Sequence, residues 1–404
     1  MRGSPLYLVS IMCLAEVLTM LGIFIFPALM PEFIINWNLS NTEAGWIAGI
    51  LLGGYALSVP ILVSLTDRTD ARLIYICGAI LTAGALFGFA YFASGFWSAF
   101  LLRLLAGIGL AGTYMPGLRV LIDRYGGGKE ARAIAFYTAC FSLGTAISFF
   151  YSGEVASIFG WVIAYKIAGF SAIGSAVFDC FLMEKKIPQI PNIKTRLLDF
   201  RPVLRNRIAM GYILAYFVHS WELFALRSWL VAFLFYSLTT QGKSEVLIMP
   251  TVVATLCALV AMVASIGGNE IAGRYGRRRI LIIFLFSSGT LAFFIGFLAT
   301  LPYWIVVILV IFYAGLIQLD SAVLTAGAVF AAEKGRRGAT LGVYAFIGFS
   351  GGALGPLVVG IILDASGGGT NTTSWGLAFA SLGLVAFLGP IALWRLRGTL
   401  KVKT

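Results

Sequence analysis

Long apolar stretches separated by short polar loops run through the whole sequence. A helix needs about 20 mostly apolar residues to cross the hydrocarbon of a membrane. Stretches of this kind begin near residues 6, 44, 73, 97, 132, 159, 208, 246, 279, 303, 338 and 374, which predicts twelve membrane-spanning helices. The first stretch, 6–30, is too long for the core of a cleavable secretion signal, so we expect it to remain as a span.

One longer polar segment interrupts this series. Residues 184–207 contain prolines and many lysines and arginines, and they leave six apolar stretches on either side. We therefore expect an all-α membrane protein of two pseudo-symmetric bundles. An N-terminal six-helix bundle would cover residues 1–183, a cytoplasmic linker 184–207 and a C-terminal six-helix bundle 208–404.

The composition agrees with a membrane protein, because 11% of the residues are charged and 60% are hydrophobic, whereas soluble proteins are about 25% charged. The net charge of +12 would indicate nucleic acid only if it formed a patch on a soluble face. Outside the apolar stretches, basic residues fall instead at the termini and in loops after even-numbered stretches, apart from Lys243. Cytoplasmic loops are rich in Lys and Arg, so we expect both termini in the cytoplasm.

Several functional classes lack their sequence signals. The five cysteines lie in apolar stretches without a CxxC pair, which disfavours a disulfide or zinc framework. The chain has no HExxH, GxSxG or P-loop motif of a membrane enzyme and no obvious filter sequence of a channel. His219 has no Met or Cys four residues away to complete a metal-binding pair. We expect neither a metal nor a cofactor, and a receptor without transport activity stays open.

Two basic turns occupy matching places in the two halves: "SLTDRTDARLIY" at 64–75 and "EIAGRYGRRRIL" at 270–281. With the twelve stretches and the basic linker, they resemble the major facilitator superfamily of secondary transporters over nearly the whole chain. The resemblance implies a latch that closes the cytoplasmic side. Its residues here would be Asp67, Arg68, Arg72, Arg274 and Arg277. Ser64 and Asp70 stand where the family has glycines, and the second turn lacks the acidic residue.

A second motif supports the same resemblance. "RLLAGIGLAG" at 103–112 is similar to the motif of the family's fourth helix, in which an Arg is often linked to proton coupling. The bacterial cyanate and nitroimidazole transporter-like group is the branch that the chain resembles most in general character. No motif supports that narrower assignment.

Ionisable residues within the predicted spans are expensive to insert, so each needs a partner or a water-filled cavity. There are nine: Glu16, Arg103, Arg119, Lys166, Asp179, His219, Glu222, Arg227 and Asp320. All but Lys166 and Asp179, which we expect at the membrane interfaces, fall on the first, fourth, seventh and tenth stretches. The resemblance implies that these four helices line a central cavity. We therefore predict that the other seven form the substrate and proton pathway.

The spacing within the seventh stretch separates its charges. His219 and Glu222 are three residues apart and share a helix face, whereas Arg227 points about 140° away from Glu222. We expect His219 and Glu222 to face the cavity, and Arg227 to contact another helix or to lie near the external rim. Asp320 is the predicted partner of Arg103 or Arg227.

Two transport functions fit these charges. The first is uptake of a small organic anion or zwitterion by proton symport, in which His219, Glu222 or Glu16 exchanges a proton between the two sides. The alternative is multidrug-type export of lipophilic or cationic compounds in exchange for protons, with the three carboxyl groups of Glu16, Glu222 and Asp320 unpaired. Trp221 and Trp229 flank the acidic site and would suit a planar substrate. The expected partners are a small molecule, protons and the lipid bilayer, with no nucleic acid, for a monomer in the plasma or bacterial inner membrane.

Overall fold

The computed structural model describes residues 5–125, 130–186, 200–242, 248–333 and 336–396. Within these ranges the regular structure is helical, and eleven helices are long and apolar enough to cross a membrane. The all-α membrane class is therefore confirmed. Of the twelve predicted spans, the first differs, because α1 has only 16 residues before the chain turns.

The helices of the first half follow the predicted stretches closely. The first stretch forms α1 (Pro5–Met20), α2 (Ile25–Ala28) and α3 (Met30–Asn36). The remaining helices are α4 (Asn41–Leu65), α5 (Ala71–Phe92), α6 (Phe96–Arg124), α7 (Glu130–Phe159) and α8 (Trp161–Leu182).

The second half starts with the short α9 (Arg201–Arg205) and the long α10 (Arg207–Thr240). The remaining elements are α11 (Pro250–Tyr275), α12 (Arg277–Ile295), the 3-10 turn η1 (Gly296–Leu298), α13 (Tyr303–Gln318), α14 (Ser321–Ala331), α15 (Arg337–Ala365), α16 (Thr372–Ala386) and α17 (Leu388–Arg395). The largest error in a predicted start is at α11, which begins at residue 250 and not at 246.

The break between α1 and α2 is held by side chains from other helices. The Ser148 hydroxyl on α7 donates to the Leu21 carbonyl oxygen at 2.7 Å and accepts from the Phe24 amide at 3.1 Å. A backbone that leaves its helix inside a membrane protein needs such partners, because lipid cannot hydrogen-bond to it. The break therefore depends on tertiary contacts, and its position within the apolar stretch could not be read from local propensity.

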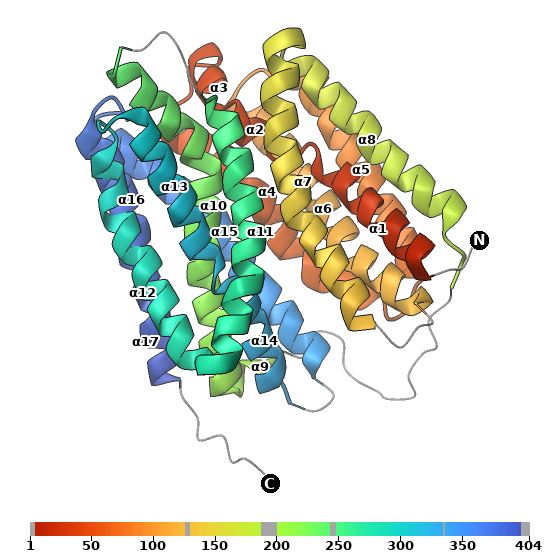
Figure 1. Ribbon diagram of the computed structural model, residues 1–404. Helices are drawn as coiled ribbons and strands as arrows, with labels where there is room; N and C mark the ends of the chain where they lie inside the picture. The colour runs from red at the N-terminus through yellow and green to blue at the C-terminus, as the bar shows by residue number, and fades with distance from the viewer. Residues whose placement is uncertain (1–4, 126–129, 187–199, 243–247, 334–335, 397–404) are drawn as a thin grey trace.

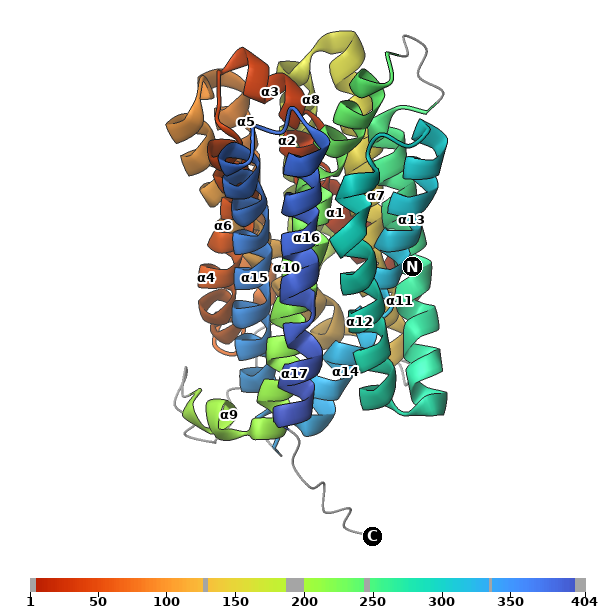
Figure 2. The same cartoon turned by 90° about the vertical axis from the view of Figure 1, so that its left-hand side faces the viewer.

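Helices from the two halves of the chain pack against one another at two seams. Figure 2 shows α4 beside α15, and a Cβ added to Gly49 would lie 2.1 Å from the Ala353 carbonyl oxygen. Such close backbone packing needs glycine. At the other seam, between α7 and α11, the Thr255 hydroxyl donates to the Ala146 carbonyl oxygen at 3.3 Å. Figure 1 shows α1 and α8 leaning away from α12 and α16 toward the lower edge.

A carboxylate joins the end of α15 to the start of α4. Asp364 accepts hydrogen bonds from the backbone amides of Asn41 (3.0 Å) and Thr42 (2.7 Å), from the Asn41 side-chain amide (2.8 Å) and from the Thr42 hydroxyl (2.6 Å). A negative charge is favourable at a helix N-terminus, where backbone N–H groups are unpaired. We call these three residues the Asp364 clasp.

We expect Asp364→Ala to lower the apparent unfolding temperature in detergent by roughly 2–5 °C, because several hydrogen bonds to one charged group are lost at a partly hydrated site. Intrinsic-fluorescence thermal scans would measure this. Glu154→Gln, which alters an exposed carboxylate near the end of α7, is the matched control. Equal unfolding temperatures for wild type and Asp364→Ala would contradict a stabilising clasp.

Candidate functional site

Two ionisable side chains meet at the break in the predicted tenth span. Asp320 lies between α13 and α14, and its Oδ1 is 2.5 Å from Nδ1 of His219 on α10. Both side chains are buried, so this contact joins α10 to the break between α13 and α14. The prediction that Asp320 pairs with Arg103 or Arg227 is therefore wrong. Residue spacing could not reveal this partner, because the break in the helix sets the direction of the Asp320 side chain.

Glu222 faces a different set of helices. Its Oε1 accepts from the Tyr313 hydroxyl on α13 at 2.9 Å, and its Oε2 accepts from the Ser288 hydroxyl on α12 at 3.0 Å. The carboxyl group is 1% exposed. Glu222 thus contacts α12 and α13, whereas His219 contacts Asp320. That both side chains face a common cavity stays a prediction.

Glu16 has a comparable partner in the first half. The Tyr137 hydroxyl on α7 lies 2.9 Å from Glu16 Oε2 and also 2.9 Å from the Tyr114 carbonyl oxygen. The Thr113 carbonyl oxygen lies 3.4 Å away as well, so one hydroxyl proton has three competing acceptors, of which the first two are nearest. The other oxygen of Glu16 is buried, and no hydrogen-bond partner for it lies in the described part of the chain.

Arg103 is buried but has a structural set of contacts. Its guanidinium donates to the carbonyl oxygens of Ile23 (2.7 Å), in the break after α1, and of Ile47 (3.3 Å), on α4. It also lies 5.8 Å from the centre of the Phe26 ring. Through these contacts Arg103 stabilises the break in the first span.

Arg227, like Arg103, is a buried cation that forms no ion pair with a described side chain. It is 6% exposed, so it does not extend to the external rim. Its guanidinium lies between two rings, 5.8 Å from the centre of Phe24 and 5.6 Å from that of Phe224. Among the residues that the structure describes, neither terminal nitrogen has a hydrogen-bond partner. Phe24 follows the break after α1, so that break brings the first half of the chain to this cation.

A small cavity lies beside Arg227. Its volume of about 10 Å³ is room for roughly one water molecule. Helices α7, α10, α11 and α13 form its walls, with Phe149 from the first half and Ala314 from α13. Ala314 follows Tyr313, the residue that donates to Glu222. A ligand in this cavity would therefore contact the turn of α13 that holds the carboxyl group.

Aromatic side chains from both halves lie between the buried charges. Tyr55 on α4 packs against Phe349 on α15, with ring centres 4.5 Å apart. Tyr216 stacks on Tyr344 at 3.9 Å and on His219 at 5.6 Å. Of the seven predicted pathway residues, Arg227 lines the cavity described above, and a common chamber for all seven stays a prediction.

Arg119 does not belong with the buried residues. Its side chain is 41% exposed and pairs with Asp123 at 2.8 Å and with Asp67 at 3.6 Å. It therefore joins the predicted latch region at the lower end of α6. Arg68 is exposed, and Arg72 donates to the Cys180 carbonyl oxygen at 2.7 Å.

Asp70, which stands at a glycine position of the family's latch, has its own role. It accepts from the Arg72 amide at the start of α5 (3.0 Å), from the Lys186 amide (2.9 Å) and from Arg124 (2.8 Å). Although partial burial tends to raise its pKa, these hydrogen bonds, with Arg124 first among them, leave the pKa of Asp70 below its usual value. The carboxylate therefore stays ionised at neutral pH, and its stabilising effect is lost only as the pH falls through the lowered pKa.

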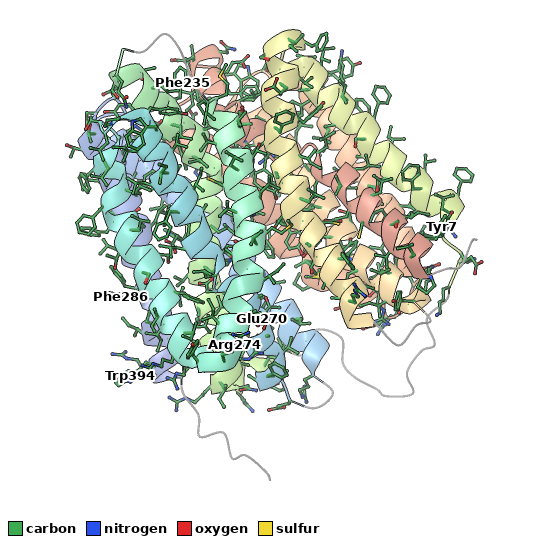
Figure 3. All side chains as sticks on the ribbon, viewed as in Figure 1. Tyr7, Phe235, Glu270, Arg274, Phe286 and Trp394 are labelled. Carbon is green, nitrogen blue, oxygen red and sulfur yellow. The ribbon has the colours of Figure 1, made fainter. Side chains whose placement is uncertain are left out.

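The second-half latch residues make no ion pair with the first half among the described residues. Arg274 lies on the exposed surface at the lower end of α11, beside Glu270 (Figure 3). The Arg277 guanidinium lies 4.9 Å from the centre of the Phe330 ring. Of the two residues expected at the interfaces, Lys166 lies 4.5 Å from the Tyr91 ring centre, whereas Asp179 is fully buried.

Residues that sequence reasoning did not select include Tyr137, Tyr313, Ser288 and Phe24. Tyrosines, serines and phenylalanines are common in membrane helices, so neither their type nor their spacing distinguished them. Their roles depend on the rotation of neighbouring helices. For a buried glutamate, a tyrosine on a facing helix is a reasonable hydrogen-bond partner to expect. The sequence alone does not show which tyrosine faces the glutamate.

The chain is similar to proteins of one family. The family model described as Major Facilitator Superfamily matches residues 12–356. The hexuronate transporter of Bacillus subtilis (strain 168) is 25% identical over 373 residues, which cover 88% of this chain and 87% of that protein. The niacin transporter NiaP of Acinetobacter baylyi (strain ATCC 33305 / BD413 / ADP1) is 25% identical over 169 residues, 42% of this chain and 37% of that protein.

Solved structures show the same fold at lower identity. A mutant of the nucleoside transporter NupG has a TM-score of 0.78 at 15% identity, covering 98% of this chain and 100% of that chain. A bacterial homolog of the human lysosomal transporter Spinster, in an inward-facing and occupied conformation, has a TM-score of 0.72 at 16% identity, covering 98% of this chain and 96% of that chain.

We expect Arg103→Met to lower the unfolding temperature by roughly 5 °C or more, because two buried carbonyl oxygens lose their charged donor. Arg119→Met should change it by less than about 2 °C, because exposed ion pairs contribute little. Thermal scans of both purified variants provide the comparison. Equal losses in the two variants would show that Arg103 does not support the break in the first span.

Proposed function

The chain belongs to the major facilitator superfamily, and on this premise we propose that it is a proton-coupled transporter that takes up a small organic anion by alternating access. Its relatives are transporters of small organic solutes, so the coarser activity is secondary transport and not enzymatic catalysis. The anion, the proton and the direction are our proposals.

Arg227 is the observation that carries the proposal for an anion. A buried cation without a compensating group is costly, so such a residue persists where a ligand supplies the opposite charge during function. Arg227 has two unpartnered terminal nitrogens and contacts Phe24 from the first half. An anion bound there would contact both halves, as a substrate of a rocking transporter must. Anion binding is favoured over the multidrug-type export considered above, because a cationic substrate would be repelled.

Proton coupling is proposed for Glu222 and Glu16. Each accepts from a tyrosine hydroxyl at 2.9 Å, and a hydroxyl can also turn to accept from a protonated carboxyl group. For Glu16, protonation would free the Tyr137 hydroxyl to bond to the Tyr114 carbonyl oxygen. For Glu222, the link to the cavity beside Arg227 is the turn of α13 in which one residue donates to the Glu222 carboxyl group and the next residue lines the cavity. We assign a supporting role to the His219–Asp320 pair, which closes the break between α13 and α14.

The contacts between the halves favour an inward-open state. The Asp364 clasp joins α15 to the start of α4, whereas the ion pairs that Asp67 and Asp70 form among the described residues stay within the first half. We propose two six-helix bundles that separate at the basic, cytoplasmic side, with both termini on that side. Asp67, Arg68, Arg72, Arg274 and Arg277 would form the latch when that side closes. The proposed setting is a monomer in the plasma or bacterial inner membrane.

We expect Arg227→Gln to reduce counterflow of a radiolabelled carboxylate in proteoliposomes by about 10- to 100-fold, because one charge-assisted contact is lost. The labelled panel would contain benzoate, nicotinate and glucuronate, with protein-free liposomes correcting for leakage. Lys166→Gln removes a cation far from the cavity and is the matched control. Unchanged counterflow in Arg227→Gln would exclude Arg227 as the anion site.

We expect Glu222→Gln and Glu16→Gln to abolish accumulation driven by an acidic exterior while retaining part of the counterflow, because a neutral amide cannot carry a proton. Accumulation and counterflow would be measured on the same proteoliposomes. Glu154→Gln should keep both activities. Full proton-driven accumulation in both glutamine variants would contradict the coupling role, and accumulation driven by an acidic interior would identify an exporter.

A further inference from the structure

The residues that line the cavity beside Arg227 indicate which chemical class of anion would bind there. Among its lining residues Arg227 is the charged one, and the wall from α11 consists of small side chains: Ala254, Cys257, Ala258 and Ala261. The Cys257 thiol is directed at the Val310 carbonyl oxygen, 3.8 Å away. The rest of the wall is made by leucines of α10 and by Phe149. One end of the cavity is therefore cationic and the remainder is apolar.

We propose that the transported anion is a monocarboxylate with a compact, apolar and preferably flat body, such as an aromatic or saturated ring, and not a sugar acid. This inference rests on the proposed function, because it assumes that the anion binds to Arg227. The inference adds the chemical class of substrate that the cavity beside Arg227 would select.

The number of available cationic groups limits the charge of the substrate. Arg103 also lies beside the broken first span, but its guanidinium is held by the carbonyl oxygens of Ile23 and Ile47. Arg227 is thus the buried arginine with free terminal nitrogens in the described part of the chain. Two parallel N–H donors match the two oxygens of a carboxylate. One guanidinium balances one negative charge, which favours a monoanion.

The aromatic neighbours of Arg227 favour a flat body. Phe24 and Phe224 lie on the guanidinium, and Phe24 stacks on Phe149 with ring centres 5.0 Å apart. Ring faces of this kind pack against flat apolar groups. Phe149 belongs to α7, so a rocking motion of the first half would move it away from α11 and enlarge the cavity. The alanines of α11 are small side chains in the cavity wall, so a ring could enter on that side only once such a motion has enlarged the cavity beyond the space of one water molecule.

Apolar walls also exclude hydroxyl groups. Every hydroxyl of a sugar acid would lose its hydrogen bonds to water and find none in this wall, which disfavours binding strongly. The chain is similar to a hexuronate transporter over most of its length, so this prediction separates the chain from that relative.

The test measures dissociation constants by isothermal titration calorimetry on the full-length protein in detergent. The ligands are benzoate, cyclohexanecarboxylate, glucuronate and the neutral benzamide. We expect benzoate and cyclohexanecarboxylate to bind about 100-fold more tightly than glucuronate. We expect them to bind about 10-fold more tightly than benzamide. Arg227→Gln should lose the preference for benzoate over benzamide. Ala258→Leu should weaken both ring carboxylates by about 10-fold or more, because the longer side chain fills the cavity.

The possible failures are distinguishable. If glucuronate binds as tightly as benzoate, and Arg227→Gln abolishes its binding, the apolar substrate class is wrong while the anion site stands. If benzamide binds as tightly as benzoate, or if Arg227→Gln leaves benzoate binding unchanged, the anion site and the substrate class both fail. Absence of binding by all four ligands to the wild type also overturns the proposal. Thermal scans establish that each variant is folded, and Lys166→Gln should behave as the wild type.

Discussion

The need to satisfy buried charge governs this structure. Nearly every ionisable side chain within the helices has found a partner from another helix: Glu16 a tyrosine, Arg103 two backbone carbonyl oxygens, Glu222 two hydroxyls, and His219 an aspartate. These contacts cross-link the helices more specifically than apolar packing can, because each requires one direction and one distance. Arg227 and Asp179 depart from this rule, because the terminal nitrogens of the first and both carboxylate oxygens of the second have no hydrogen-bond partner among the described residues. The proposed anion site uses the first of these departures.

The broken first span connects this chemistry to the fold. Leaving the helix at residues 21–24 exposes backbone groups that Arg103 and Ser148 satisfy, and it brings Phe24 to the Arg227 guanidinium. Discontinuous helices are a common way to build midplane sites in transporters, since their free backbone groups need polar neighbours. The second break, at Asp320, places its carboxylate on His219 in the same manner.

The contacts between the two halves connect the cavity beside Arg227 with a relative motion of the halves. Close glycine packing and the Asp364 clasp hold α4 to α15, whereas Arg119 keeps Asp67 within its own half. Arg227 and its cavity lie where α7 of the first half meets α10 and α11 of the second. A small displacement of one half would therefore change the volume beside the cation directly, and the neighbouring Tyr313 would transmit that change to Glu222.

Sequence alone determined the all-α membrane class and the start of each long apolar stretch to within a few residues, because the length and polarity of a span are local properties that lipid imposes. It also singled out the ionisable residues, since an isolated charge in an apolar stretch is conspicuous. It did not determine their partners. Glu16 and Tyr137 are 121 positions apart, and Asn41 and Asp364 are 323 apart, so their contacts depend on how distant helices rotate and where they break. Only the tertiary structure decided that Asp320 meets His219, that Arg119 forms exposed ion pairs and that the terminal nitrogens of Arg227 have no hydrogen-bond partner among the described residues.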